Sequence, residues 1–371
     1  MGLAIGIVGL PNVGKSTLFN ALLGQAQAAA ENYPFCTIEP NLGMVPVPDE
    51  RLARLSALFR PQKTTFTTLE FVDIAGLVAG ASRGEGLGNQ FLSHIRQVDA
   101  VAHVLRCFED PDVVHVSGGP DPRGDRDVVE TELMLKDLEQ LEKRREKASR
   151  DAKAPGKAGE PARAELHAID AVKAGLERGV PARAQALPPE AQDHLRHLQL
   201  LTAKPVLYVA NVDERQLADP ADAKVAAVRA LAEAEGAPCV VICGKVEAEL
   251  ADLDPPERAE YLRSLGLEEP GLMRLVHASY RLLHLVTFFT VGPNECRAWT
   301  VPAGTHAPQA AGAVHTDFER GFIRAEVVRA EDLLAAGSEH AAREKALMHV
   351  EGRDYVVQDG DVIHFKFNVQ V

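Results

Sequence analysis

A glycine-framed loop between an apolar run and a helical pattern is the feature that most restricts the fold of this chain. The loop reads Gly9-Leu-Pro-Asn-Val-Gly14-Lys15-Ser16-Thr17 and fits the pattern G-x-x-x-x-G-K-[ST] at every defined position. A β-branched run, Ile5 to Val8, precedes it, and a helical pattern, Thr17 to Leu23, follows it. Backbone N–H groups and a helix N-terminus would converge there, which predicts a phosphate-binding loop.

The side chains of this loop have separate predicted roles. Lys15 would neutralise the β- and γ-phosphates of a nucleotide, and the Ser16 hydroxyl would coordinate magnesium. The predicted nucleotide-binding residues of the loop are Asn12, Val13, Gly14, Lys15, Ser16 and Thr17.

Two further segments have the pattern of nucleotide switches. In Asp73-Ile-Ala-Gly76, the Asp73 carboxylate would hold magnesium through water and the Gly76 N–H would meet a γ-phosphate. The glycine-dense stretch that follows is interpreted as a mobile switch. Thr37 lies between Pro34 and Pro40, where its hydroxyl would reach magnesium only when the γ-phosphate is present. An ordinary proline-bounded loop is the alternative for this segment.

A fourth segment bears on the choice of base. After the run Val206 to Ala210 comes Asn211-Val212-Asp213-Glu214, where a guanine-specific G protein has N-K-x-D. Val212 replaces the lysine whose stem packs on the base, and Glu214 replaces the aspartate that reads guanine. We therefore predict adenine, packed against Val212, with Cys243 and Gly244 closing the pocket through backbone groups. The alternative is that Asp213 slides one place to read guanine.

The organisation of the chain follows from its changing periodicity. Strand and helix patterns alternate from Ala4 to Leu105 and resume at Pro205, which predicts an α/β P-loop NTPase G domain with a mostly parallel sheet. We place this domain at residues 1–125 and 200–280, an inserted helical hairpin at 126–199 and a small α+β domain at 281–371. The apolar side of the first inserted helix is predicted to comprise Val129, Leu133, Leu135, Leu138 and Leu141.

Charge and composition restrict the partners. With 40 Lys and Arg against 53 Asp and Glu, the net charge is −13, which argues against coating nucleic acid through bulk charge. The insertion is neutral, and its tip, Lys143 to Lys157, holds seven basic and two acidic residues. We interpret the tip as a candidate RNA contact, against the alternative of a solvated helix face.

Compartment and assembly are predicted from what the chain lacks. No run approaches the roughly 18 apolar residues of a membrane helix, so no membrane association is expected. Five scattered cysteines fit free thiols in a reducing compartment, which favours the cytoplasm. No sustained heptad repeat extends beyond the short insertion, which favours a monomer. Whether Cys36, beside Thr37, has a redox role stays open.

Taken together, these motifs resemble the Obg-like ATPases of the YchF family. The resemblance also rests on Gly84-Glu-Gly-Leu-Gly-Asn89, on Ala307-Pro-Gln-Ala-Ala-Gly312 and on His315-Thr-Asp-Phe318, and it runs essentially end to end. It implies a TRAFAC-class P-loop NTPase with a coiled-coil insertion and a C-terminal TGS domain, a β-grasp module. It further implies magnesium-dependent ATP hydrolysis, poor use of GTP, and association with the ribosome, including its large subunit, with rRNA or tRNA contacts through the insertion and the TGS domain.

The group that positions water is not evident from the motifs. The usual glutamine directly after D-x-x-G is replaced by Leu77, so a slow intrinsic rate is expected. The substitute would be a mobile residue such as His115, a main-chain group, a monovalent cation or a partner acting in trans. Asn12 occupies the place that potassium-activated G proteins use to coordinate the cation, which makes potassium a hypothesis. His115 resembles a histidine proposed as the catalytic group in the family, although a lone histidine in an apolar run is more often structural.

Two rival functions remain at this point. The first is a GTPase of the Obg class, in which backbone contacts recover guanine binding; competition between ATP and GTP separates it from an ATPase. The second is a nucleotide-gated scaffold whose hydrolysis is incidental. A Lys15→Ala variant that still restored cellular function would favour the scaffold.

Overall fold

The chain is organised as two compact units. The computed structural model describes residues 3–30, 41–74, 87–111, 119–219 and 221–368. The first unit contains the phosphate loop and Glu70–Leu282, and the second contains Met44–Leu69 and Leu283–Val371. The described residues form two six-stranded sheets, one centred in each unit.

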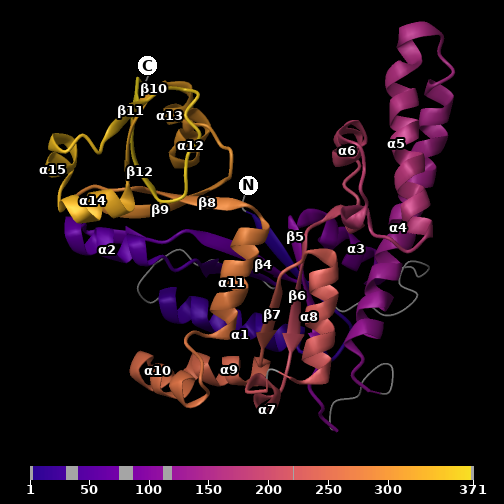
Figure 1. Ribbon diagram of the computed structural model, residues 1–371, viewed down its shortest axis with the longest axis horizontal. Helices are drawn as coiled ribbons and strands as arrows, with labels where there is room; N and C mark the ends of the chain where they lie inside the picture. Colours follow the sequence, from indigo (N-terminus) through magenta and orange to yellow (C-terminus); the bar gives the residue numbers. More distant parts are fainter. Residues whose placement is uncertain (1–2, 31–40, 75–86, 112–118, 220, 369–371) are drawn as a thin grey trace. The chain divides into compact units, whose positions relative to one another are not determined.

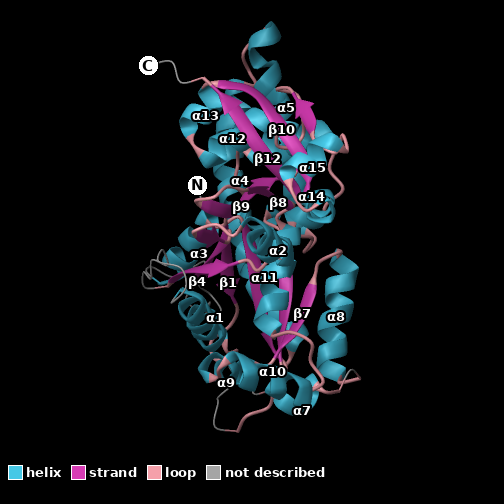
Figure 2. Ribbon diagram, turned by 90° about the vertical axis from the view of Figure 1, so that its left-hand side faces the viewer, coloured by secondary structure: helices cyan, strands magenta, loops and turns pink. Residues whose placement is uncertain are grey.

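The sheet centred in the first unit has the order β2-β4-β1-β5-β6-β7. Figure 1 labels its strands β4, β5, β6 and β7, and Figure 2 labels β1. Its strands are β1 (Ala4–Val8), β2 (Leu42–Pro46), β4 (Thr68–Asp73), β5 (Ala100–Arg106), β6 (Val206–Asn211) and β7 (Cys239–Ile242). The pairs β1/β4, β1/β5, β5/β6 and β6/β7 are parallel. Strands β1, β5 and β6 are buried along their whole length, which explains why they read as apolar runs and not as alternating patterns. The predicted α/β class is confirmed.

Helices connect these strands and anchor one another. They are α1 (Lys15–Ala30), α3 (Leu87–Gln97), α7 (Glu214–Leu217), α8 (Ala223–Glu235), α9 (Gly244–Asp252), α10 (Pro255–Ser264) and α11 (Gly271–Leu282). The buried Glu247 of α9 accepts hydrogen bonds from the backbone N–H groups of Gly271 (2.7 Å) and Leu272 (3.3 Å). The Glu247 side chain therefore accepts from N–H groups of the first turn of α11, where a carboxylate is favoured.

The insertion is a helical hairpin that extends away from the sheet of its unit (Figure 1). It comprises α4 (Pro122–Asp151), η1 (Gly156–Gly159), α5 (Glu160–Glu177), η2 (Ala182–Ala184), α6 (Pro189–Arg196) and η3 (Leu201–Ala203). Leu141 of α4 packs in its apolar core with Ile169, Val172 and Leu176 of α5, and Leu138 packs against that core, so Leu138 and Leu141 lie on the predicted side. Leu135 was wrongly placed on that side, since it is 40 % exposed. Leu135 follows Leu133 by two residues, which is a rotation of about 200° around the helix axis, so the two side chains point to opposite sides of α4.

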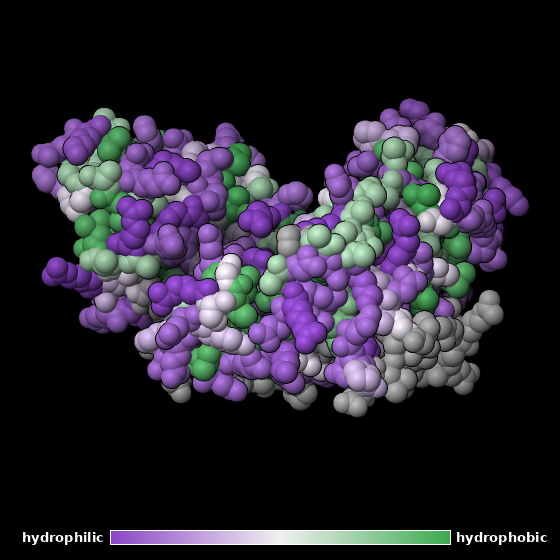
Figure 3. Space-filling view, turned by 60° about the horizontal axis from the view of Figure 1, so that its bottom comes forward, coloured by the Kyte–Doolittle hydropathy of each residue, from purple (hydrophilic) through white to green (hydrophobic). Residues whose placement is uncertain are grey.

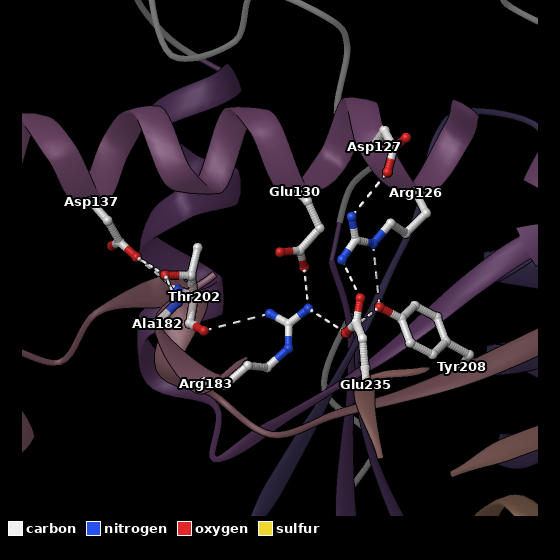
Figure 4. Close-up of polar contacts among 9 residues, drawn as sticks. All are labelled: Arg126, Asp127, Glu130, Asp137, Ala182, Arg183, Thr202, Tyr208 and Glu235. Carbon is white, nitrogen blue, oxygen red and sulfur yellow. Dashed lines mark hydrogen bonds and ion pairs between the residues drawn. The ribbon is translucent and has the colours of Figure 1, made fainter. Parts of the chain in front are cut away.

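Ion pairs fix the root of the insertion to the sheet (Figure 4). Arg183 bridges Glu130 of α4 (2.8 Å) and Glu235 of α8 (3.1 Å). Glu235 also pairs with Arg126 and accepts a hydrogen bond from the Tyr208 hydroxyl of β6 at 2.9 Å. These charges lie in a largely buried environment, where losing one partner leaves the other uncompensated.

A second root contact uses a single carboxylate. Asp137 of α4 is fully buried and accepts hydrogen bonds from Leu201 N (2.8 Å), Thr202 N (2.8 Å) and Thr202 Oγ1 (2.6 Å). It therefore caps η3, the segment through which the insertion returns to β6.

The second unit has a mixed sheet in the order β11-β10-β12-β8-β9-β3. Its strands are β3 (Lys63–Thr65), β8 (Leu285–Thr290), β9 (Glu295–Pro302), β10 (Phe322–Arg329), β11 (His349–Glu351) and β12 (Asp361–Phe367). Its helices are α2 (Glu50–Phe59), α12 (Ala307–Val314), α13 (Thr316–Arg320), α14 (Ala330–Ala336) and α15 (Glu339–Glu344). Helices α12 and α13 lie beside β10 and β12 (Figure 2), whereas α2 and α14 belong to a separate apolar cluster.

The second unit differs from the predicted C-terminal domain by one segment. We placed residues 44–69 in the nucleotide-binding domain, but they group with the C-terminal residues. Leu52 and Leu55 of α2 are fully buried in the C-terminal core, and β3 pairs in parallel with β9. Arg51 forms an ion pair with Asp359 at 2.6 Å. Residues far apart in sequence therefore share this unit, and the domain bounds predicted from the sequence stay a prediction.

The surface is mainly hydrophilic on the face shown in Figure 3, with hydrophobic side chains scattered over it. Among the described residues, the exposed large hydrophobic side chains are Leu135, Ile323 and Val350. No helix within the described ranges is both long and apolar enough to cross a bilayer.

Candidate nucleotide-binding site

The phosphate loop joins β1 to α1 at the carboxyl edge of the parallel sheet. Helix α1 begins at Lys15, so its first turn points unpaired N–H groups at the loop. Asn12 has a φ of 62° and lies at the exposed part of the loop, whereas Val13 is fully buried. Gly14 has a φ of 93°, and a Cβ there would lie 2.2 Å from Asn211 Nδ2. The second glycine of the motif is thus required by both conformation and space.

Lys15 lies inside the loop and not in solvent. Its side chain is 7 % exposed, and its ammonium donates a hydrogen bond to the Leu10 carbonyl at 2.8 Å. Burial lowers the pKa of Lys15 to about 8, and the nearby Asp73 carboxylate partly opposes that shift. A polyphosphate chain would restore the stability of the charged form.

Ser16 and Asp73 provide oxygen donors suited to magnesium. The Ser16 hydroxyl donates a hydrogen bond to Asp73 Oδ2 at 3.0 Å. Asp73 Oδ1 is buried and has no hydrogen-bond partner among the described residues. Hydroxyl and carboxylate oxygens are the ligands that magnesium prefers, and the unpaired buried oxygen is the kind of group that a cation or its water would satisfy. The residues fit the predicted ion.

Asn211 connects the phosphate loop to the base-binding loops. Its Nδ2 donates to the Val13 carbonyl at 2.8 Å, and its Oδ1 accepts from Gly244 N at 3.1 Å. Its backbone carbonyl accepts from Cys107 N (2.8 Å) and Phe108 N (3.2 Å). Because Asn211 is 4 % exposed, its ends of all four hydrogen bonds are shielded from water.

A pocket of about 680 Å³ opens beside Asn211. Its lining comprises Gly14, Thr17, Phe108, Glu109, Asp110, Asn211, Val212, Asp213, Glu214, Arg215, Cys243, Gly244, Lys245 and Ala248. It therefore brings together the predicted loop residues Gly14 and Thr17 and the predicted base-binding residues. Val212 is 2 % exposed and anchors the pocket wall, and its N–H donates to Ile242 O at 2.9 Å.

Asp213 is used as a helix cap. Its Oδ1 accepts from Gln216 N at 2.9 Å, while its own N–H donates to Gln216 Oε1 at 3.0 Å. This reciprocal arrangement is a capping box at the start of α7. A carboxylate held in this way is poorly placed to read a base, which weighs against Asp213 as a substitute guanine reader. Glu214, the first residue of α7, is exposed at the pocket.

Phe108 is a pocket residue that the motifs did not predict. It follows β5 by two residues and is half-buried in the pocket wall. A Cβ at Gly14 would lie 4.0 Å from its Cε1, so the ring stands next to the phosphate loop. Its position after a fully buried parallel strand was the available signal, because ligands of such sheets bind at the carboxyl ends of the strands.

Several predicted site residues lie outside the described residues. These are Thr37, Gly76 and His115, together with Leu77. Their predicted roles stay predictions.

The fold and this site define a P-loop nucleotide-binding protein with a G-domain sheet. Residues 4–150 match the family MMR_HSR1, described as "50S ribosome-binding GTPase". Residues 285–368 match YchF-GTPase_C, described as "Protein of unknown function (DUF933)".

Relatives match over the full chain. The "Ribosome-binding ATPase YchF" of Bacillus subtilis is 53 % identical over 370 residues, and that of Escherichia coli O157:H7 is 51 % identical over 369; both alignments cover 100 % of each chain. A solved structure, the Schizosaccharomyces pombe YchF GTPase, has a TM-score of 0.90 and 35 % identity over 98 % of each chain. The chain belongs to the YchF family, as its motifs predicted. The names of these relatives disagree on the nucleotide.

The buried position of Lys15 predicts a pH dependence of nucleotide binding. Below about pH 8 the free protein already carries the Lys15 charge, so the ATP Kd should be nearly constant. Above that pH the lysine must take up a proton on binding, and the Kd should rise by up to about tenfold per pH unit. Calorimetric titration from pH 7 to 9.5 measures this. The exposed pocket residue Lys245 serves as the control, because Lys245→Met should retain the inflection; a flat profile would contradict the prediction.

Proposed function

We propose that this protein is a magnesium-dependent ATPase with a slow intrinsic rate that binds the ribosome. The observation that carries the choice of nucleotide is the pocket in which Val212 and Glu214 stand where guanine-specific proteins have lysine and aspartate. The names of its close relatives, ribosome-binding ATPases, support the same function.

The preference for adenine follows from the hydrogen-bonding groups that the pocket has in place of the lysine and aspartate of N-K-x-D. Guanine selectivity requires a carboxylate at the depth of the fourth motif position to accept from two N–H groups. The Glu214 side chain is longer than the aspartate of N-K-x-D and is exposed. The Asp213 carboxylate is held in the cap of α7. Adenine needs no paired acceptor, so the apolar wall at Val212, the Phe108 ring and the backbone of Cys243 and Gly244 suit it better.

Exchange of two residues should convert the base preference. We expect ATP to displace a labelled nucleotide from the wild type at lower concentration than GTP. Val212→Lys combined with Glu214→Asp recreates N-K-x-D and should shift the ATP/GTP affinity ratio toward GTP by at least about tenfold. The control Arg215→Lys, at an exposed pocket residue, should leave the ratio unchanged. A wild type that prefers GTP would reject the proposal.

The triphosphate would be held by the loop and its neighbours. Lys15 and the first N–H groups of α1 bind the phosphate oxygens and orient the chain. Ser16, Asp73 through water, and Thr37 would hold magnesium, which when bound neutralises phosphate charge. Gly76 would offer its N–H to the γ-phosphate.

The water-positioning function is proposed for two groups, because Leu77 cannot orient water. One is a potassium ion at Asn12, and the other is His115. In single-turnover assays, potassium should accelerate hydrolysis relative to sodium, and Asn12→Ala should remove that difference. His115→Ala should lower the rate in both salts. Equal rates in the two salts would exclude potassium, and an unchanged rate for the histidine variant would exclude His115.

The basic tip of the insertion is proposed as an RNA contact on the large ribosomal subunit. Not all of its cations are available. Arg144 pairs with Glu165 at 2.5 Å and Arg145 with Asp170 at 2.6 Å, so both contribute to packing of the hairpin. Lys153 and Lys157, near the turn, are exposed. They are better candidates for RNA contact than the two paired arginines of the same tip. A further rRNA or tRNA contact is proposed for the C-terminal domain.

Charge reversal at the tip tests this contact. The double variant Lys153→Glu, Lys157→Glu should reduce co-sedimentation with large ribosomal subunits to about a tenth at 100 mM salt. The matched control, Arg123→Glu with Arg178→Glu, changes the same charge at exposed positions at the other end of the two helices. Equal loss in both pairs would indicate bulk electrostatics and reject a tip contact.

The cytoplasm is the proposed compartment, and a monomer the proposed state. Ribosome binding requires access to the cytoplasm. The described cysteines Cys107, Cys239, Cys243 and Cys296 are free thiols, as expected in a reducing environment.

A further inference from the structure

Arg106 is an arginine buried beneath the base pocket. It is the last residue of β5, is 2 % exposed, and is among the largest fully buried side chains of the described chain. A buried guanidinium requires acceptors for its N–H groups. It finds two of them in the loop that follows its own strand: Nε donates to Phe108 O and Nη2 donates to Asp110 O, each at 3.2 Å.

The same guanidinium supports the Phe108 ring. Arg106 Cζ lies 4.5 Å from the ring centroid, within the range of a cation–π contact. Phe108, Glu109 and Asp110 line the pocket, whereas Arg106 is buried and is not among the lining residues. Arg106 therefore fixes both the backbone of this loop and the plane of its aromatic side chain from the buried side.

The loop is also tied to the phosphate-binding side of the site. Phe108 N donates to the Asn211 carbonyl, and the Asn211 side chain holds Val13 O. Gln216 Nε2 donates to Cys107 O at 3.0 Å. Phe108 is thus held between the phosphate loop and the base-binding loops. The purine of a nucleotide whose phosphates are bound would contact the Phe108 ring there.

We propose that Arg106 is a positioning residue for nucleobase affinity and acts through Phe108. This inference rests on the proposed function, in which the pocket holds the purine of ATP. An aromatic wall that is ordered before binding saves the cost of ordering it on binding. A lysine could not replace the arginine, because its single ammonium cannot serve two separated carbonyls and stack on a ring.

The experiment separates base binding from phosphate binding. Affinities for ATP and for inorganic tripolyphosphate are measured by calorimetry for the wild type, Arg106→Met, Phe108→Ala and the double variant. Methionine keeps much of the volume without leaving an unpaired charge. We expect Arg106→Met to weaken ATP binding about tenfold and to leave tripolyphosphate binding within about twofold. The double variant should bind ATP no more weakly than Phe108→Ala alone.

A matched control is available in the same unit. Arg258 also donates to two carbonyls, Leu250 O (3.0 Å) and Leu253 O (3.1 Å), but contributes no lining to the pocket. Arg258→Met should leave the affinities for both ligands unchanged.

Three outcomes would overturn the inference. Equal loss of ATP and tripolyphosphate binding in Arg106→Met would indicate general damage to the site. Multiplicative losses in the double variant would show that Arg106 acts independently of Phe108. Unchanged ATP affinity would show no role. Failure of the wild type to bind ATP more tightly than tripolyphosphate would instead reject the proposed base pocket itself.

Discussion

The buried side chain of Asn211 is the contact on which the nucleotide site depends. One amide holds the Val13 carbonyl and the Gly244 N–H, which lie 198 and 33 residues away in sequence. Since an amide has a donor and an acceptor end, it can join a carbonyl to an N–H, which neither aspartate nor leucine of similar size could do. The phosphate loop, strand β6 and the loop before α9 therefore keep a fixed spacing. For that reason, the phosphate-binding and base-binding parts of the site are held by the same residue.

Buried charged side chains are concentrated where the insertion packs against the sheet that carries the nucleotide site. Arg126, Glu130, Arg183 and Glu235 alternate in sign, and Tyr208 brings strand β6 into the same group. Such pairs need not add net stability, because desolvation offsets much of their attraction. Their directional geometry fixes how α4 leaves the sheet. Three residues beyond Tyr208 the same strand ends at Asn211, so the insertion and the nucleotide site share a strand.

The sequence predicted best what local chemistry determines. The phosphate loop, Asp73 at the end of β4 and the base motif after β6 were each recognisable, because a short motif carries its own geometry. Phe108 and Arg106 were missed, since no local pattern distinguishes a pocket aromatic or a buried arginine from ordinary residues. Leu135 was misplaced by ignoring helical phase. The assignment of α2 to the second unit depended on contacts between residues more than two hundred positions apart, which periodicity cannot encode.

The interleaving of the second unit has a consequence for synthesis of the chain. Leu52 and Leu55 emerge early, yet their partners Phe289, Val328 and Val362 are translated more than two hundred residues later. A growing chain therefore presents these leucines without their core until the later strands have been synthesised. Contacts of such high sequence separation also slow folding, because loop closure precedes any gain from packing. Truncation near residue 282 would leave a nucleotide domain with an unfinished apolar segment in its middle, because the core around α2 forms only after the strands from β8 to β12 have left the ribosome.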